Sequence, residues 1–141
     1  WGAYLVAAGA NTILIGKLSD SSFSKSKLMV LGYWLNAFFT FAYIFVGGPL
    51  SLFVVQIGLG FAAALATPTW QALYAKYQNK KKSGMVWGLF SGESKIISGV
   101  AVILGGFVIN HLSFAWLFVV MGIVQTFAAL YQSKIFAFTK E

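Results

Sequence analysis

Long uncharged stretches, separated by short segments that contain lysine, make up most of this chain. No Asp, Glu, Lys or Arg occurs in residues 1–16, 28–75 or 96–133. A bilayer core of roughly 30 Å needs about 20 apolar residues in a helix, so each of the two longer stretches holds two spans. Turn signals lie near their middles, at residues 47–49 and 110–113. We expect helices at 1–15, 28–45, 50–76, 85–109 and 114–131.

The composition agrees with this pattern. Hydrophobic residues make up 59% of the sequence and charged residues 9%, whereas a soluble domain carries about 25% charged residues. The sequence therefore predicts an all-α, polytopic membrane protein. The chain has no cysteine, which excludes disulfides and thiolate metal sites. It begins with Trp1 inside an apolar run, so we expect a partial transmembrane bundle that starts within a span.

The lysines predict the orientation in the cell membrane. Nine of the ten lie in three segments, 17–27, 76–82 and 134–140, which five alternating spans place on one side. By the positive-inside rule this side, with the C-terminus, is cytoplasmic. Topology thus explains the net charge of +7, and no basic stripe suggests nucleic-acid binding. The exception is Lys95.

A loop motif follows the first predicted span. Glycine lets a chain leave a helix, an aspartate favours the positive end of a neighbouring helix, and basic residues anchor a loop at the lipid surface. The segment resembles the loop signature of the major facilitator superfamily of transporters, although Ser21, Phe23 and Ser24 depart from it. An ordinary turn between two helices is the alternative. The matching residues are Gly16, Leu18, Ser19, Asp20, Lys25 and Leu28.

The third predicted helix strengthens the resemblance. Its residues 58–60 are glycine-rich, and its end, 68–77, is similar to the tenth helix of bacterial members of that superfamily. Two signatures of the first half, an Arg in the fourth helix and a Gly-Pro pair in the fifth, have no counterpart here. The resemblance therefore implies helices eight to twelve, the C-terminal half of a permease. It also implies secondary transport of a small solute by alternating access, with an N-terminal half elsewhere, no cofactor, a proton as the driving ion, and a cytoplasmic gate around Asp20.

Two charged residues lie inside the fourth predicted span. Glu93 and Lys95 each cost about 2.5–3.5 kcal/mol at mid-bilayer, so such residues usually face a bundle interior or water. Two positions apart, they point about 200° apart around a helix and do not pair with each other. Each is a candidate for coupling or transport, or for a structural pairing with another helix. Glu93 could also lie in a polar interface, and the long side chain of Lys95 could reach the membrane surface. The polar residues of the third helix, Gln56, Thr67 and Gln71, are candidates for a cavity wall or for buried hydrogen bonds between helices.

Other small and polar residues in the spans suggest helix packing. Gly84, Gly88 and Gly92 recur every fourth position, and this spacing lets two helices approach closely, in a static or a sliding contact. Lone polar residues in spans more often join helices than bind solute. They are Asn11, Asn36 and Gln125.

Signatures of enzymes and metal sites are missing from the sequence. His111, the single histidine, falls in a predicted outer turn, and no nucleophile–base pair, zinc-ligand spacing or phosphate-binding loop occurs. A non-transporting membrane scaffold or assembly subunit is the alternative to a transporter. Whether the polar residues converge on a water-accessible cavity distinguishes the two.

Overall fold

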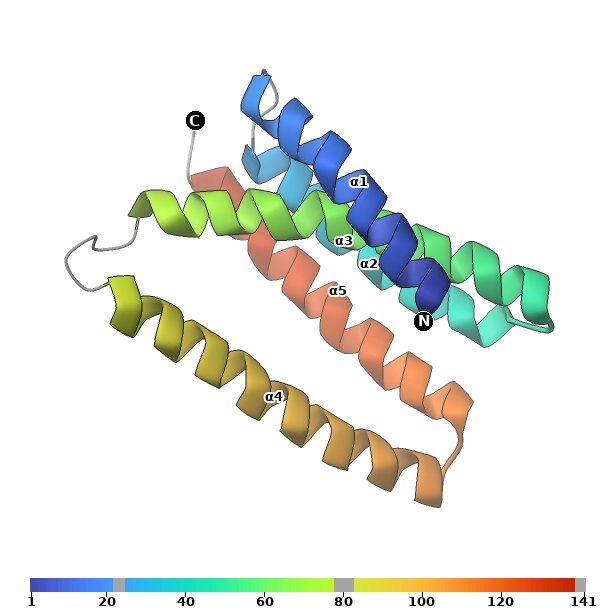
Figure 1. Cartoon of the computed structure of the whole chain (residues 1–141). Helices are drawn as coiled ribbons and strands as arrows, with labels where there is room; N and C mark the ends of the chain where they lie inside the picture. The colour runs from blue at the N-terminus through green and yellow to red at the C-terminus, as the bar shows by residue number, and fades with distance from the viewer. Residues whose placement is uncertain (22–24, 78–82, 139–141) are drawn as a thin grey trace.

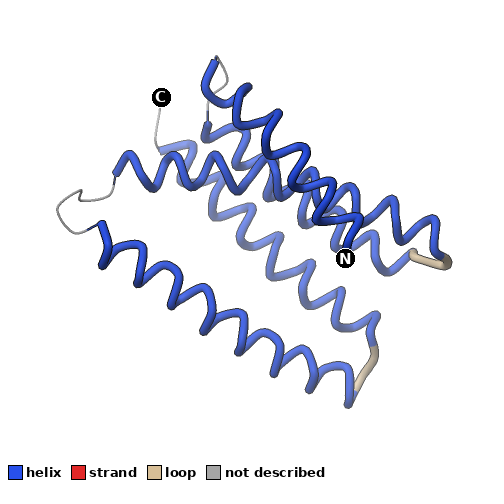
Figure 2. Tube along the Cα trace, in the orientation of Figure 1, coloured by secondary structure: helices blue, strands red, loops and turns tan. Residues whose placement is uncertain are grey.

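The computed structural model describes residues 1–21, 25–77 and 83–138, and every regular element in these ranges is helical. The prediction of an all-α fold is confirmed (Figures 1 and 2). The elements are α1 (Gly2–Ser21), α2 (Lys25–Ala42), a 3-10 turn η1 (Tyr43–Phe45), α3 (Pro49–Tyr77), α4 (Ser83–His111) and α5 (Phe114–Phe138).

Four of the described helices are long and apolar enough to cross a membrane, and large apolar side chains are exposed along all of them. The chain is therefore a multi-pass membrane protein in a lipid environment. The assignment of residues 1–15 of α1 as a fifth span stays a prediction. The four segments are Lys25–Phe45, Pro49–Lys76, Gly84–His111 and Phe114–Lys134.

Local sequence explains where two of the helices start. Pro49 opens α3, at a position where its missing N–H costs no hydrogen bond. Ser113 precedes α5, and its hydroxyl accepts the Trp116 backbone N–H at 3.4 Å, as an N-cap residue does. Both sites lie in the turns expected from the uncharged stretches.

The end of the first helix differs from the expectation. The sequence suggested that the chain leaves the helix at Gly16, but α1 continues to Ser21. No described glycine adopts a positive φ, so Gly16 does not act as a helix C-cap. A glycine inside a helix costs only about 1 kcal/mol relative to alanine, which neighbouring turns can offset.

The centre of the bundle is α3, which packs against α1 on one side and α2 on another. These helices meet almost backbone to backbone. A Cβ added to Gly60 would lie 2.7 Å from the Tyr4 carbonyl oxygen of α1, and one added to Gly32 of α2 would lie 2.7 Å from the Ala66 nitrogen. Small side chains fill the contact, and Ala64 is 0% exposed. Such close approach gives membrane helices their van der Waals contact.

The contact between α2 and α5 combines a small residue with a hydrogen bond. A Cβ on Gly122 would meet the ring of Phe41 at 2.6 Å. Thr40, only 2% exposed, donates its hydroxyl proton to Gln125 Oε1 at 2.8 Å. The prediction that Gln125 joins helices is thereby confirmed. Asn11 instead donates to the Ala7 carbonyl of its own helix.

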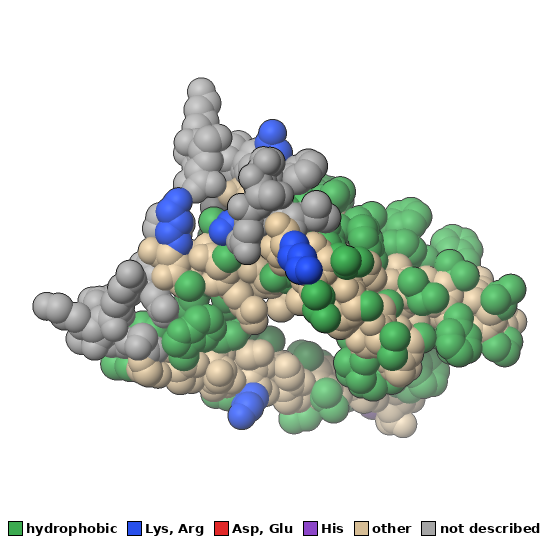
Figure 3. All heavy atoms as spheres, turned by 45° about the horizontal axis from the view of Figure 1, so that its top comes forward, with side chains coloured by type: hydrophobic (Ala, Val, Ile, Leu, Met, Phe, Trp, Pro, Cys, Tyr) green, Lys and Arg blue, Asp and Glu red, His purple; other side chains and the backbone are tan. Residues whose placement is uncertain are grey.

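The outlying helix is α4. None of the most apolar part of this helix is buried, and it shares only a limited contact with α5 near the turn that joins them. A Cβ on Gly105 would lie 3.5 Å from Leu117 at that end. The space-filling view shows an opening between the layer of α4 and the rest of the bundle (Figure 3).

The close approach at Gly60 can be tested by substitution. We expect Gly60→Leu to lower the free energy of unfolding by about 1–3 kcal/mol, because α1 and α3 must separate to admit the side chain. Denaturant unfolding in detergent micelles, followed by circular dichroism, measures the change. The control is Gly9→Leu on α1, where an added Cβ meets no atom within 4 Å. Equal losses in the two variants would contradict the packing described here.

Candidate transport site

Four aromatic residues join α3 to α4 beside the segment 78–82 that connects them. The ring centroids of Trp70 and Phe90 lie 4.6 Å apart in an edge-to-face contact, and those of Tyr74 and Trp87 lie 5.5 Å apart. Tyr74 and Phe90 are 5.9 Å apart. We call Trp70, Tyr74, Trp87 and Phe90 the aromatic cluster. Pairs of this kind add about 0.5–1.5 kcal/mol each beyond the area that they bury.

The aromatic cluster sets the register of α3 against α4. Because the two helices run in opposite directions from their connection, Thr67 and Glu93 each lie three residues deeper than Trp70 and Phe90, or about 4.5 Å. Thr67 is seven residues from Tyr74 and so falls within about 20° of it around α3. Glu93 falls about 60° from Phe90. Glu93 and Trp87 lie on opposite sides of Phe90 around α4. Because Tyr74 contacts Trp87, Thr67 lies on the Trp87 side of the boundary between the helices and Glu93 on the other side.

Thr67, Gln71 and Glu93 all have exposed side chains, on the two helices that flank this boundary. Gln71 lies one turn nearer the aromatic cluster than Thr67. No hydrogen bond or ion pair joins Glu93 to another residue of the described ranges. Exposed groups of this kind can form hydrogen bonds to a polar solute, and the carboxyl group of Glu93 can also transfer a proton.

Gln56 lies apart from these residues. It is half-buried on α3, eleven positions from Thr67 and so about 16 Å away along the axis. Between them, Gly60 contacts α1, and Ala64 belongs to a buried core with Ile15 and Leu65. The polar stripe of the third helix is therefore interrupted by a packing contact and does not form one continuous wall.

Lys95 is exposed on α4 and lies about 200° around the helix from Glu93. The two charged groups thus occupy different faces, as expected from their spacing. No three His, Asp or Glu side chains of the described residues lie close enough together to hold a metal ion.

The residues of the loop motif have separate surroundings. Gly16 lies inside α1, where an added Cβ would meet no neighbour, and Lys25 is the first residue of α2. Leu28 packs against the core of Ile15, Ala64 and Leu65, so it has a structural role. The side chains of Leu18, Ser19 and Asp20 lie outside the described part of the chain, and a gating role for Asp20 stays a prediction.

Sequence reasoning missed the aromatic cluster. A signal was present, because Trp70 and Tyr74 are four positions apart and Trp87 and Phe90 three, so each pair shares a helix face. Aromatic residues near span ends are also typical of the membrane interface. Nothing local distinguishes an aromatic pair that faces lipid from one that faces another helix.

The fold is that of a polytopic helical membrane protein with exposed polar groups on two of its spans. Comparison with known proteins gives its class. The sequence model of the Major Facilitator Superfamily matches residues 2–140. The chain therefore belongs to this superfamily of membrane transporters, which confirms the resemblance seen in its motifs and points to transport of a small solute.

One curated relative is also informative. The protein described as "Uncharacterized MFS-type transporter YitZ" of Bacillus subtilis (strain 168) is 23% identical over 121 residues. The match covers 86% of this chain and 73% of that protein. No solved structure matches the chain.

The aromatic cluster should hold α4 against α3. We expect Phe90→Ala to broaden and lengthen the distance distribution between spin labels on the two helices, because Phe90 contacts both Trp70 and Tyr74. Pulsed electron paramagnetic resonance with labels introduced at Ala72 and Ser91 measures it. Phe107→Ala is the control, since that ring stacks on His111 of its own helix. An unchanged distribution in Phe90→Ala would show that other contacts hold α4.

Proposed function

We propose that this chain is the C-terminal half of a secondary transporter that moves a small solute by alternating access. It supplies helices eight to twelve, and the other half of the solute path comes from an N-terminal half. In transporters of this superfamily two halves rock around a site near the middle of the bilayer. Family membership supports transport in general, and the register between α3 and α4 supports the place of the site in this chain.

One observation carries the proposal. Thr67, Gln71 and Glu93 have exposed side chains, and each lies within about one helical turn of a residue of the aromatic cluster, on the two helices that it joins. Polar groups inside a membrane are costly in lipid, so they usually face a bundle interior or a water-filled path. The solute path therefore runs along the α3–α4 boundary.

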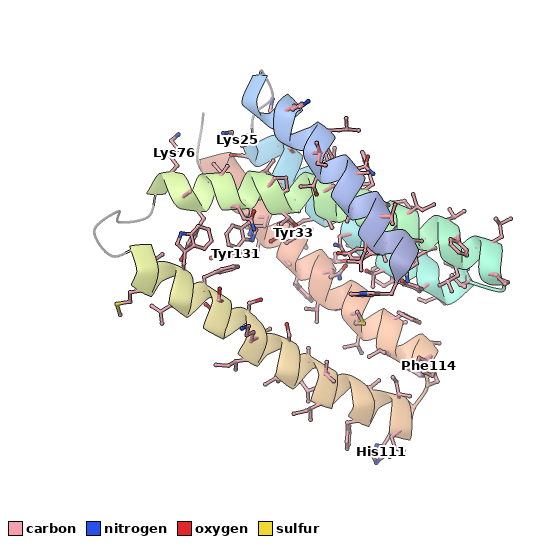
Figure 4. All side chains as sticks on the ribbon, viewed as in Figure 1. Lys25, Tyr33, Lys76, His111, Phe114 and Tyr131 are labelled. Atoms are coloured by element: carbon pink, nitrogen blue, oxygen red, sulfur yellow. The ribbon has the colours of Figure 1, made fainter. Side chains whose placement is uncertain are left out.

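The proposed orientation places the lysine-rich ends of the helices in the cytoplasm. Lys25 and Lys76 lie at one end of the bundle and His111 and Phe114 at the other (Figure 4). The positive-inside rule then assigns the end with Lys25 and Lys76 to the cytoplasm and the turn before Phe114 to the outside.

Single cysteines test this orientation, and these 141 residues contain no cysteine of their own that would react. We expect Ser113→Cys to react with a membrane-impermeant thiol reagent added to intact cells, and Ser83→Cys to react only after the cells are opened. The reverse labelling pattern would overturn the assignment.

We further propose that Glu93 couples proton movement to solute movement. It is the one acidic residue in the four candidate spans of the described chain. A carboxyl group that is protonated on one side of the membrane and released on the other can link a proton gradient to a solute.

Replacing the carboxyl group by an amide tests the coupling. We expect Glu93→Gln, which mimics the protonated form, to retain solute exchange but to lose accumulation driven by an imposed pH gradient. The assay follows uptake of individual candidate solutes by vesicles containing the complete transporter, with and without the gradient. Exchange without a gradient is the internal control for folding. Undiminished gradient-driven accumulation in Glu93→Gln would remove Glu93 from the coupling mechanism.

A further inference from the structure

Two exposed lysines flank the contact between α2 and α5 at one end of the bundle. Lys27 lies in the first turn of α2 and Lys134 in the last part of α5. One candidate span begins at Lys25 and another ends at Lys134, so both exposed lysines lie at the ends of spans. This is the end of the bundle at which Lys25 and Lys76 lie (Figure 4). Lysines at such positions meet the headgroups of the surrounding phospholipid.

A hydrogen bond fixes the depth of α2 against α5 near these lysines. The indole Nε1 of Trp34 donates to the Ser133 hydroxyl at 3.1 Å, and that hydroxyl donates to the Ala129 carbonyl oxygen at 2.7 Å. Trp34 and Ser133 therefore lie at similar depths. At about 1.5 Å per residue, Lys134 lies about 1.5 Å, and Lys27 about 10 Å, nearer the end of the bundle.

The hydrogen bond between Thr40 and Gln125 marks one side of the contact between α2 and α5. Thr40 lies about 120° around α2 from Trp34, and Gln125 about 80° around α5 from Ser133, both in the same rotational sense. The two helices run in opposite directions, and in antiparallel helices the same rotational sense leads to the same side of their contact. Trp34 and Ser133 are therefore displaced toward the opposite side.

Both exposed lysines lie on this opposite side, which we call the open side. Lys27 falls within about 20° of Trp34 around α2, and Lys134 lies about 100° from Ser133 in the direction away from Gln125. Nearer the middle of the membrane, the open side carries large apolar side chains that no described residue covers. They are Leu31 and Phe38 of α2 and Phe127 and Leu130 of α5.

Neither helix has an acidic residue that could neutralise these lysines. Residues 25–42 and 114–138 contain no Asp or Glu. Within the described ranges, no ion pair joins Lys27 or Lys134 to another residue. Basic groups between membrane helices at the headgroup level bind the phosphate groups of anionic lipids. A soluble phosphate ion would leave the apolar side chains of the open side uncovered, whereas a phospholipid satisfies both the lysines and these side chains.

We propose that Lys27 and Lys134 bind the headgroup of an anionic phospholipid whose acyl chains lie along the open side of the α2–α5 contact. Trp34 lies beside both lysines, and because Ser133 accepts its N–H, the ring presents its apolar surface to the lipid. The site is on other helices than the candidate transport site. The proposal therefore does not depend on transport or on Glu93.

Brominated phospholipids test the site in the complete protein, with a bimane fluorophore at Phe127→Cys in a background without other cysteines. The phosphatidylcholine vesicles contain increasing fractions of brominated phosphatidylglycerol or of brominated phosphatidylcholine. Quenching of the fluorophore by bromine reports which lipid occupies the open side. We expect phosphatidylglycerol to be preferred by about 5-fold to 25-fold, because each lysine near the surface contributes about fivefold.

Variants of single lysines locate the site. We expect Lys27→Gln and Lys134→Gln each to lower the preference by about 3-fold to 5-fold. The matched control is Lys17→Gln, which removes an exposed lysine of α1, a helix that packs against α3, and should leave the preference unchanged. Quenching by brominated phosphatidylcholine should be equal in all variants, which checks that the fold and the position of the fluorophore are retained.

Three outcomes would overturn the proposal. One is equal quenching by the two brominated lipids in the unmodified protein. Another is a loss of preference in Lys17→Gln as large as that in Lys134→Gln, which would show a diffuse positive field and not a site. The third is a preference that disappears when inorganic phosphate is added at constant ionic strength, which would assign the lysines to a soluble anion.

Discussion

The rest of this structure depends on the close approach of α3 to its two neighbours. Gly60 brings α3 against the backbone of α1, and Gly32 brings α2 against the backbone of α3. Lipid tails are as apolar as leucine, so packing of surfaces without gaps, and not removal from water, holds membrane helices together. With α1, α2 and α3 fixed in this way, the hydrogen bond from Thr40 to Gln125 adds α5.

The attachment of α4 follows a different principle. The aromatic cluster joins it to α3 at one end, the turn before Phe114 joins it to α5 at the other, and its most apolar part is unburied in between. Its two charged residues lie on different faces: Glu93 flanks the α3–α4 boundary, and Lys95 lies about 200° around the helix from it. The helices α1, α2, α3 and α5 thus carry most of the packing, while the groups proposed for function lie on α3 and α4.

Charge and hydropathy were enough to predict the helical membrane fold, because the cost of charge in lipid leaves a strong pattern. Gln125 was also predicted correctly, since an isolated polar residue in a span needs a partner. The prediction that the first helix ends near Gly16 was wrong, because a glycine allows the chain to leave a helix but does not require it. Contacts between distant segments could not be predicted from the sequence. No local pattern shows that Gly60 faces α1 or that Phe90 contacts Trp70.

The central claim is that a water-accessible solute path runs between α3 and α4, and cysteine accessibility tests it most directly. Single cysteines at Thr67, Gln71 and Glu93 would be compared with one at Phe38, which is exposed on α2 within a membrane span. In the complete transporter in vesicles, the account predicts that a water-soluble thiol reagent labels the first three at least about tenfold faster than the fourth, because thiols ionise and react in water far more readily than in hydrocarbon. Labelling of Thr67→Cys and Glu93→Cys as slow as that of Phe38→Cys would contradict it.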